Sequence, residues 1–275
     1  MDFPLELLQT LRIAHRVVAL TGAGVSQESG LRTFRDAHPS TALRHSERQS
    51  NRQDNSSGQA GLWVQYRPED LASPEAFARN PKLVWDWYAW RREAVKSVRP
   101  NPGHVALAEM AHHVPEFTLI TQNVDGLHRM AEKSLKVVET YKDYPILELH
   151  GNIQRVRCAE CGAFTETWSD DTEQVPRCAV CGGMLRPDVV WFGESLPRSE
   201  LEAAVEAARK CDVFFSIGTS GVVQPAASLA FAAHNQGAVV AEVNLEPTPL
   251  TSKADYFLQG KSGEVLPELV KAVWG

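Results

Sequence analysis

Residues 16–35 decide the fold and read RVVALTGAGVSQESGLRTFR. The mainly apolar run Arg16 to Leu20 predicts a short buried strand, which breaks at Gly22 and Gly24 before small hydroxyl residues that can cap a helix. Such a strand-to-helix turn suits an anion, because glycine lets the backbone approach it and the first helical turn offers free N–H groups. The stretch favours the phosphates of a dinucleotide, and the alternative is a tight turn without a ligand.

The glycine spacing departs from the usual dinucleotide fingerprint. Gly22 and Gly24 are followed by Gly30 rather than by a glycine three positions on. Arg35 supports an anion site nonetheless, since a guanidinium after the loop can return to the phosphates as a planar donor fork.

The composition limits the function classes. The chain has 275 residues, 43% of them hydrophobic, so it can form one large domain with or without a small satellite. A net charge of −6 and a pI near 5.9 give no basic footprint for nucleic acid, but they suit a basic peptide partner. No apolar run approaches a membrane span, and Met1 to Leu11 carries acids rather than the basic start of a signal peptide. We therefore expect a cytosolic protein that binds neither nucleic acid nor membrane.

Four of the five cysteines form two pairs. Cys158 and Cys161 are separated by sixteen residues from Cys178 and Cys181. This spacing is typical of two knuckles that present four thiolates to one zinc ion, and the alternative is a pair of disulfides. Cys211 precedes the apolar run Val213 to Ile217, and we interpret it as a buried small hydrophobe.

Predicted strands and helices alternate along most of the chain. This order predicts a doubly wound α/β domain with a parallel sheet and right-handed crossovers. Ligands of such sheets bind beyond the carboxyl ends of the strands. Small or amide residues follow four predicted strands at that edge: Gly22, then Gln122 and Asn123, then Gly218 and Thr219, then Asn244.

Several segments lie outside this alternation. Asp36 to Gly61 is polar with almost nothing to bury, and predicts a long loop that is disordered without ligand. Ser73-Pro74 and Asn101-Pro102 each signal a helix start. Lys82 to Val98 predicts an unusually aromatic helix, and Met130 to Pro145 has no clear shape.

A set of motifs along the chain resembles those of the sirtuins, which are NAD-dependent protein lysine deacylases. The matches occur in the family's order over nearly the whole chain. They are Gly22 to Ser26 with Thr33-Phe34-Arg35, Thr121 to Asp125, Leu149 to Gly151, the two cysteine pairs, Val190 to Glu194, Gly218 to Ser220, and Asn244.

The resemblance implies a division of the chain into three parts. Residues 1–36, 102–153 and 187–275 would form a Rossmann-like NAD-binding domain, residues 37–101 a cofactor-binding loop and helical module, and residues 154–186 a zinc-binding module. The helical and zinc modules would make up a small domain, with an acyl-lysine channel between it and the large one. In the family's reaction the acyl oxygen attacks the nicotinamide ribose, nicotinamide leaves, and O-acyl-ADP-ribose forms.

By the same resemblance, His150 is the general base that accepts a ribose hydroxyl proton. An imidazole has a suitable pKa near neutrality, although a hydrogen-bonded core histidine is the alternative. Asn123 and Asp125 would contact the nicotinamide ribose and carboxamide, and Gln122 would bind the cofactor beside them, with helix capping as the alternative for all three.

The remaining expected contacts divide among the cofactor, the metal and the peptide. Four thiolates fill the zinc coordination, so the ion would be structural. Val190, Trp191, Phe192 and Gly193 would hydrogen-bond an extended peptide as an added strand, unless they form an ordinary buried strand. The cofactor residues would be Gly22, Ala23, Gly24, Ser26 and Arg35 for the phosphates, Thr33 and Phe34 in the motif that ends at Arg35, and Gly218, Thr219, Ser220, Asn244, Leu245, Glu246 and Ser262 for the adenosine half.

Tyr88 and Arg91 lie three positions apart and thus on one helix face. They match the pair that lines the acyl channel in the sirtuin branch acting on acidic acyl groups, where the guanidinium binds a carboxylate bidentately and the phenol adds a hydrogen bond. The alternative is a solvated arginine beside a core tyrosine. We therefore expect removal of succinyl, malonyl or glutaryl groups, with some deacetylation.

Two segments are longer than the resemblance leads us to expect: roughly His38 to Ser57, and Glu132 to Pro145. The first segment extends the cofactor-binding loop and could hinder its closure over NAD. Three functions stay open: the acidic-acyl deacylase, a plain deacetylase or mono-ADP-ribosyltransferase, and a non-catalytic module that binds NAD or acylated peptides. The expected partners are acylated lysine side chains of proteins, and we expect a monomer.

Overall fold

The computed structural model describes residues 2–31, 66, 68–135 and 142–275. It consists of two compact units: Met1–Gly30, Ser97–Asn152 and Ser195–Gly275 form the first, and Leu31–Lys96 and Ile153–Glu194 form the second. The expected loop over Asp36 to Gly61 lies outside the described residues, as do Thr33, Phe34 and Arg35. The finer three-part division expected from the sequence stays a prediction.

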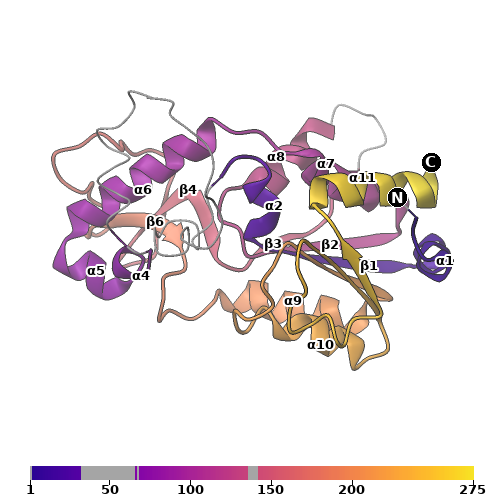
Figure 1. The fold of residues 1–275 in the computed structure, drawn as a ribbon. Helices are drawn as coiled ribbons and strands as arrows, with labels where there is room; N and C mark the ends of the chain where they lie inside the picture. The colour runs from indigo at the N-terminus through magenta and orange to yellow at the C-terminus, as the bar shows by residue number, and fades with distance from the viewer. Residues whose placement is uncertain (1, 32–65, 67, 136–141) are drawn as a thin grey trace, which may run out of the picture. The chain divides into compact units, whose positions relative to one another are not determined.

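The first unit is built on a six-stranded sheet in the order β3-β2-β1-β7-β8-β9, with every neighbouring pair parallel (Figure 1). The doubly wound parallel sheet predicted from the alternating pattern is confirmed. Its strands are β1 (Arg16–Thr21), β2 (Glu116–Thr121), β3 (Ile146–Glu148), β7 (Val213–Ile217), β8 (Val239–Asn244) and β9 (Tyr256–Gln259).

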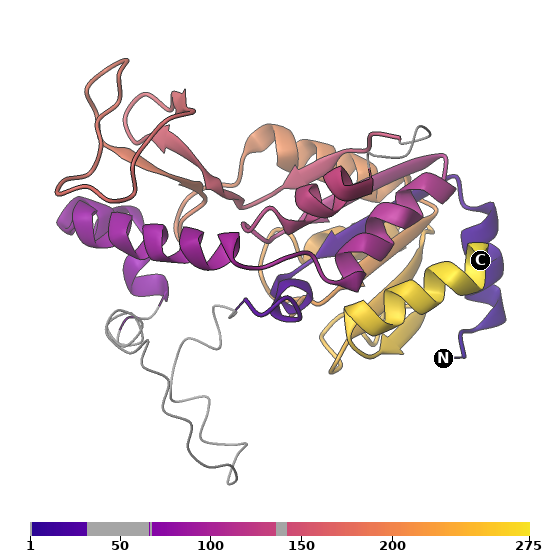
Figure 2. The ribbon, with the colours of Figure 1, turned by 90° about the horizontal axis from the view of Figure 1, so that it is seen from above.

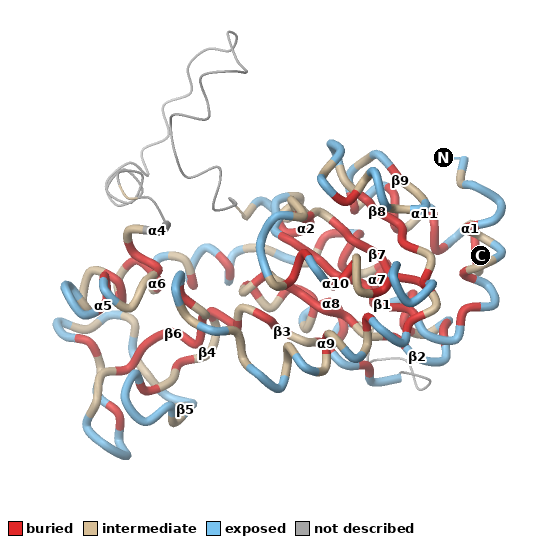
Figure 3. The backbone as a smooth tube through the Cα atoms, turned by 90° about the horizontal axis from the view of Figure 1, so that it is seen from below, coloured by how far each residue is buried: buried red, intermediate tan, exposed pale blue. Residues whose placement is uncertain are grey.

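Helices cover both faces of this sheet, because successive side chains of a buried parallel strand point to opposite faces. Val17 and Ala19 of β1 pack in one cluster with α1 (Leu5–Ile13), α7 (Pro102–His113) and α11 (Ser262–Trp274). Val18 and Leu20 pack in the other, with α9 (Arg198–Lys210) and α10 (Ser228–His234). Figure 2 shows α7 and α11 side by side, and Figure 3 shows the buried strands between the layers.

The strand register brings the carboxyl ends level. Thr21 at the end of β1 lies opposite Thr121 of β2 and Ile217 of β7, and Ile217 lies opposite Val243 of β8. The segments that follow these strands therefore meet at one edge of the sheet. They include the short helix α2 (Ala23–Gln27), and α8 (Leu127–Leu135) follows the turn after β2.

The second unit combines helices α4 (Pro68–Leu71), α5 (Pro74–Arg79) and α6 (Pro81–Lys96) with a small sheet. The sheet has the order β5-β4-β6, from β4 (Gly151–Cys158), β5 (Phe164–Thr165) and β6 (Leu185–Val189). The aromatic character of α6 serves the core, since Trp85 and Tyr88 are fully buried. Arg92 is buried as well, and its guanidinium pairs with Asp170.

Both helix starts predicted from the sequence are confirmed. The Ser73 hydroxyl accepts a hydrogen bond from the Ala76 amide, and the side-chain oxygen Oδ1 of Asn101 accepts one from the Gly103 amide. None of the helices in the described part of the chain has the length and apolarity needed to cross a membrane.

Candidate functional site at the carboxyl edge of the sheet

The turn after β1 packs directly against the turn after β7. The Gly24 amide donates to the Gly218 carbonyl oxygen at 2.8 Å, and the Gly22 amide donates to Ile217 at 3.0 Å. A Cβ on Gly24 would lie 2.8 Å from the Gly218 oxygen, and one on Gly22 would lie 2.7 Å from Cβ of Thr219. The two glycines are thus required by the close contact of the two turns, a reason that the sequence pattern did not supply.

Asn123 ties the turn after β2 to the turn after β1. Its Nδ2 donates to the Gly22 carbonyl oxygen and to the Ser26 hydroxyl, both at 2.9 Å, while its own amide donates to the Thr121 hydroxyl. Asn123 is buried, and both of these side-chain bonds use Nδ2 rather than Oδ1. The side chain therefore has acceptor capacity left for a ligand.

Asp125 lies two residues further on and is also buried. One carboxylate oxygen accepts from the Leu127 amide at 2.9 Å, at the start of α8. Burial raises the pKa of this carboxyl above its ordinary value, while hydrogen bonds from Leu127 and Ser26 oppose that rise. The helix-capping alternative and a ligand-binding role are compatible here, because the second oxygen has no part in the bond to Leu127.

Thr219, just after β7, forms hydrogen bonds with a residue that follows β2 and with the last residue of β8. The Gln122 Nε2 donates to its hydroxyl at 3.0 Å, and the Asn244 Nδ2 donates to its carbonyl oxygen at 2.8 Å. The amide residues expected at the edge are therefore brought together within the first unit. Four further cofactor candidates lie on or beside these segments: Ala23, Leu245 and Glu246 are exposed, and Ser220 is half-buried.

His150 follows β3 and lies beside the same edge. Its Nδ1 is 2.9 Å from the carbonyl oxygen of Gln122. A carbonyl only accepts, so Nδ1 carries the hydrogen and Nε2 carries the lone pair. Burial lowers the pKa of His150 below its ordinary value, and the hydrogen bond to Gln122 offsets part of that effect. The imidazole is thus neutral near pH 7 and held in the tautomer that a general base requires.

Beneath these turns lies a buried polar network that sequence analysis missed. The Thr21 hydroxyl lies 2.9 Å from both the Thr121 hydroxyl and Nε2 of His128. The His128 ring packs 4.6 Å from that of His104, and burial lowers the pKa of both, to about 4 for His104. The histidines are therefore neutral, and they support the turn that carries Asn123.

Ser262 is the first residue of α11, and it forms hydrogen bonds with Glu28, a partner that the sequence around Ser262 did not indicate. Its amide and hydroxyl donate to one carboxylate oxygen of Glu28 at 2.7 and 2.6 Å, and the Gly263 amide donates to the other at 2.9 Å. Glu28 is thus the N-terminal cap of α11. The predicted role of Ser262 at the adenosine stays a prediction, and its hydroxyl hydrogen is already committed.

In the second unit, Tyr88 and Arg91 lie on α6. The Tyr88 hydroxyl is fully buried and accepts a hydrogen bond from Nε1 of Trp191 at 3.0 Å. Burial raises the pKa of Tyr88 to about 12, so the phenol keeps its hydrogen at any physiological pH. The Arg91 guanidinium lies over the Trp87 ring, 4.9 Å from its centroid.

The predicted peptide-pairing segment is irregular. Strand β6 ends at Val189, Val190 and Trp191 belong to no strand or helix, and Phe192 and Gly193 form a turn. Because β6 stops short of it, the segment is not part of an ordinary buried strand. Phe192 is 52% exposed, and its amide donates to the Ala72 carbonyl oxygen at 2.9 Å.

The four paired cysteines gather at one point. Their sulfur atoms all lie within 4.8 Å of one another, with 3.4 Å between Cys158 and Cys181 and 3.8 Å between Cys161 and Cys178. Zinc–sulfur bonds of about 2.3 Å set thiolates of a tetrahedron roughly 3.8 Å apart, whereas a disulfide needs about 2.05 Å. The cluster therefore fits one structural zinc ion, and the zinc prediction is confirmed over the disulfide alternative. Cys211 is buried, as predicted.

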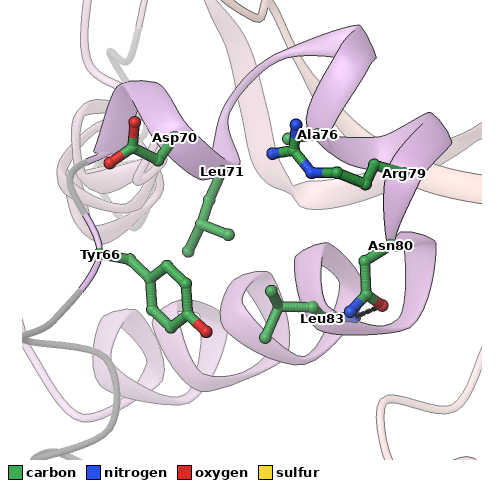
Figure 4. Close-up of a pocket in the computed structure, with 7 residues that line it drawn as sticks. All are labelled: Tyr66, Asp70, Leu71, Ala76, Arg79, Asn80 and Leu83. Carbon is green, nitrogen blue, oxygen red and sulfur yellow. Dashed lines mark hydrogen bonds between the residues drawn. The ribbon is translucent and has the colours of Figure 1, made fainter.

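A cavity of about 260 Å³ lies among α4, α5 and α6 (Figure 4). Tyr66, Leu71 and Leu83 give it apolar walls, and Asn80 accepts from the Leu83 amide at 3.1 Å. Its described lining, which also includes Asp70, Ala76 and Arg79, contains none of the predicted site residues.

The edge of the sheet offers the chemistry that NAD requires. The hydroxyl and amide groups of Ser26, Asn123 and Thr219 can form hydrogen bonds with ribose hydroxyls. The segments after β1 and β7 meet at glycines, so no side chain covers the backbone there. The donor set therefore fits the cofactor expected from the motifs.

Comparisons with known proteins agree with this site. A model of the Sir2 family matches residues 45–225. The NAD-dependent protein deacylase 2 of Pyrobaculum aerophilum is 45% identical over 269 residues, which cover 98% of this chain and 95% of the relative. The NAD-dependent protein deacylase of Aquifex aeolicus is 46% identical over 254 residues, covering 92% and 93%.

Solved structures give the same result. A Sir2 homologue in complex with NAD has a TM-score of 0.81 and 43% identity, covering 99% of this chain and 94% of that one. A Sir2 protein bound to a myristoylated histone peptide has a TM-score of 0.67 and 32% identity, covering 98% and 94%. The chain therefore belongs to the Sir2 family, the sirtuins, which are NAD-dependent protein deacylases.

Proposed function

We propose that this chain is an NAD-dependent protein lysine deacylase that prefers acidic acyl groups, namely succinyl, malonyl or glutaryl, and that retains some deacetylation. Membership of the Sir2 family supports the general activity, because relatives that are 45% and 46% identical are NAD-dependent protein deacylases. The products would be nicotinamide and O-acyl-ADP-ribose. The substrates would be acylated lysine side chains of proteins.

The observation that carries the acidic preference is the pair Tyr88 and Arg91 on α6. The phenol is buried and keeps its hydrogen, so it can donate to an acceptor that enters the interior. The guanidinium is a planar, permanently charged donor fork lying over Trp87. A carboxylate at the end of an acyl chain can accept hydrogen bonds from a phenol and a guanidinium, whereas an acetyl methyl group can accept none.

At the edge of the sheet we assign roles to four residues of the first unit. His150 would accept a ribose hydroxyl proton at Nε2, and the Gln122 carbonyl oxygen would hold its tautomer. Asn123 would bind the nicotinamide ribose and carboxamide through Oδ1, and Asp125 would bind them through its carboxylate. When bound, NAD supplies the electrophilic ribose carbon and a neutral leaving group.

Other acyl groups are the alternatives. A Sir2 protein 32% identical to this chain binds a myristoylated histone peptide, so a long apolar acyl group is one of them, and acetyl is another. A plain deacetylase, a mono-ADP-ribosyltransferase and a non-catalytic binding module are the remaining candidates from the sequence.

The test is NAD-dependent deacylation of one lysine peptide that carries acetyl, succinyl or myristoyl, with wild type and Arg91→Met. We expect wild type to prefer succinyl, and Arg91→Met to lower kcat/KM for succinyl about ten- to hundredfold relative to acetyl, as loss of a charge-assisted hydrogen bond predicts. Arg198→Met, on an exposed side chain of α9, is the matched control. Equal rates for succinyl and acetyl that Arg91→Met leaves unchanged contradict the proposal.

The proposal also includes a cytoplasmic, monomeric enzyme. The reducing conditions of that compartment would keep four thiols available to zinc, in agreement with sulfur separations too long for disulfides. Fractionation of cells and sedimentation of the purified chain test these two statements.

A further inference from the structure

The indole of Trp191 lies at the centre of a buried cluster in the second unit. Its Nε1 donates to the Tyr88 hydroxyl at 3.0 Å, and its ring lies 5.2 Å from the ring of Phe77. The guanidinium of Arg186 stacks on it, 3.3 Å from the ring centroid. Trp191 is only 2% exposed, so these contacts fix the ring from several directions.

The main chain of Trp191 is fixed as well. Glu194 accepts from the Trp191 amide at 2.8 Å, and its two oxygens accept from the two terminal nitrogens of Arg186 at 2.5 and 2.9 Å. Arg186 also donates to the Val189 carbonyl oxygen at 2.9 Å. Backbone and ring of Trp191 are therefore held by the same arginine–glutamate pair, which leaves the indole little rotational freedom.

The direction of the bond between Trp191 and Tyr88 is chemically determined. An indole N–H can only donate, so the phenol oxygen must be the acceptor. The phenol hydrogen then has to point away from Trp191, and among the described residues Trp191 is the one hydrogen-bond partner of this hydroxyl. The buried Tyr88 is thus left as a donor with a fixed orientation.

We propose that Trp191 determines acyl specificity as a positioning residue: its indole N–H holds the Tyr88 hydroxyl as a donor toward the terminal carboxylate of an acidic acyl group. This inference rests on the proposed function and deepens it. The indole does not touch the acyl group. It restricts the rotation of the phenol hydrogen in advance, so that less entropy is lost when a carboxylate binds.

The experiment compares wild type, Trp191→Phe, Tyr88→Phe and the double variant on succinyl-lysine and acetyl-lysine versions of one peptide. Phenylalanine keeps an aromatic ring against Arg186 and Phe77 but removes the N–H. We expect Trp191→Phe to lower the succinyl-to-acetyl ratio of kcat/KM about two- to tenfold, through the KM of the succinyl peptide. In the Tyr88→Phe background the same substitution should leave the ratio unchanged, because the hydroxyl that it orients is absent.

Two controls separate positioning from packing. Trp90→Phe replaces a tryptophan that is 36% exposed and lies on α6, the helix of Tyr88. This substitution should leave the succinyl-to-acetyl ratio of kcat/KM at the wild-type value. If Trp191→Phe does not fold, replacement of Trp191 by 3-benzothienylalanine keeps the bicyclic shape and exchanges only N–H for sulfur. Melting temperatures identify variants that have lost the fold.

The outcomes distinguish this inference from the proposed function. If wild type shows no succinyl preference, or Arg91→Met does not reduce it, the proposed function fails and the inference with it. If Arg91→Met removes the preference while Trp191→Phe leaves the ratio unchanged, the inference alone is overturned. It is also overturned if the effects of Trp191→Phe and Tyr88→Phe multiply in the double variant.

Discussion

Nδ1 of His150 lies 2.9 Å from the carbonyl oxygen of Gln122, so the imidazole has a defined tautomer. The acceptor is a main-chain group in the turn after β2, and that turn also carries Asn123 and Asp125. The strand register that places β2 beside β3 therefore also orients the histidine. The same contact links the proposed base to the residues proposed to bind the cofactor.

Substitution of His150 tests its proposed role as the general base. His150→Asn keeps a polar side chain but removes the proton acceptor, and we expect kcat to fall about 10²- to 10⁴-fold, as is usual when a general base is lost. NAD affinity and melting temperature should change little. His15→Asn, at an exposed histidine, is the matched control. Near-wild-type turnover in His150→Asn would exclude this role.

The pH dependence of catalysis gives a second test. A base must be unprotonated, and burial lowers the pKa of His150 below 6.5, its value in water. The neutral form therefore persists as pH falls to 6.5, and the acidic limb of kcat/KM should appear only below that pH. An acidic limb centred at or above pH 6.5 contradicts the assignment. Far-UV circular dichroism at each pH separates this effect from acid unfolding.

Asn123→Asp should uncouple the two turns that Asn123 joins. The carboxylate would face the Gly22 carbonyl oxygen, from which Nδ2 of asparagine is now 2.9 Å away. We expect a loss of about 1–3 kcal/mol in the free energy of unfolding and weaker NAD binding, since a buried acceptor loses its donor. Urea unfolding and an NAD titration measure these. Asn235→Asp, at an exposed position after α10, should change neither, and equal effects of both substitutions would refute the argument.

The residues at the carboxyl edge of the sheet could be predicted from the sequence, because each strand and its end are indicated by neighbouring residues. Strands β1, β2, β7 and β8 are mainly apolar runs, and each ends at or just before a small or amide residue, as at Gly22 and Asn244. Parallel pairing then brings these ends together without further information. The cysteine pairs are equally local, since spacing alone indicates that four thiolates meet.

Contacts between segments distant in sequence could not be predicted in this way. Glu28 caps a helix that begins 234 positions later, and nothing near Glu28 indicates that partner. Likewise, the motif at Trp191 suggested peptide pairing through its main chain, whereas its indole bonds to Tyr88 at a separation of 103 positions. Gly24 was predicted to allow the close approach of a phosphate, and in the structure the group that a Cβ there would meet is the Gly218 oxygen.

Loss of one thiolate should abolish stoichiometric zinc binding. Cys161→Ser leaves three sulfur ligands, and we expect zinc per chain, measured by inductively coupled plasma mass spectrometry, to fall from one to well below one after dialysis. The melting temperature should fall as well, because the knuckles have little apolar core of their own. Cys211→Ala is the control, since Cys211 lies outside the cluster. Full zinc content in Cys161→Ser would contradict a four-thiolate site.

Glu28→Ala should destabilise the first unit through α11. The carboxylate accepts from the Ser262 amide, the Ser262 hydroxyl and the Gly263 amide, and the first turn of α11 would lose all three acceptors. We expect a loss of about 1–2 kcal/mol in the free energy of unfolding, the range of N-cap removal, measured by urea denaturation. Glu264→Ala removes an exposed carboxylate from the same helix turn, where a surface ion pair with Lys261 contributes little. If both variants lose the same stability, the cap is not the cause. If Glu28→Ala alone is destabilised, the capping contact holds α11 to the turn after β1, and weaker NAD binding in that variant would show that this contact also shapes the cofactor site.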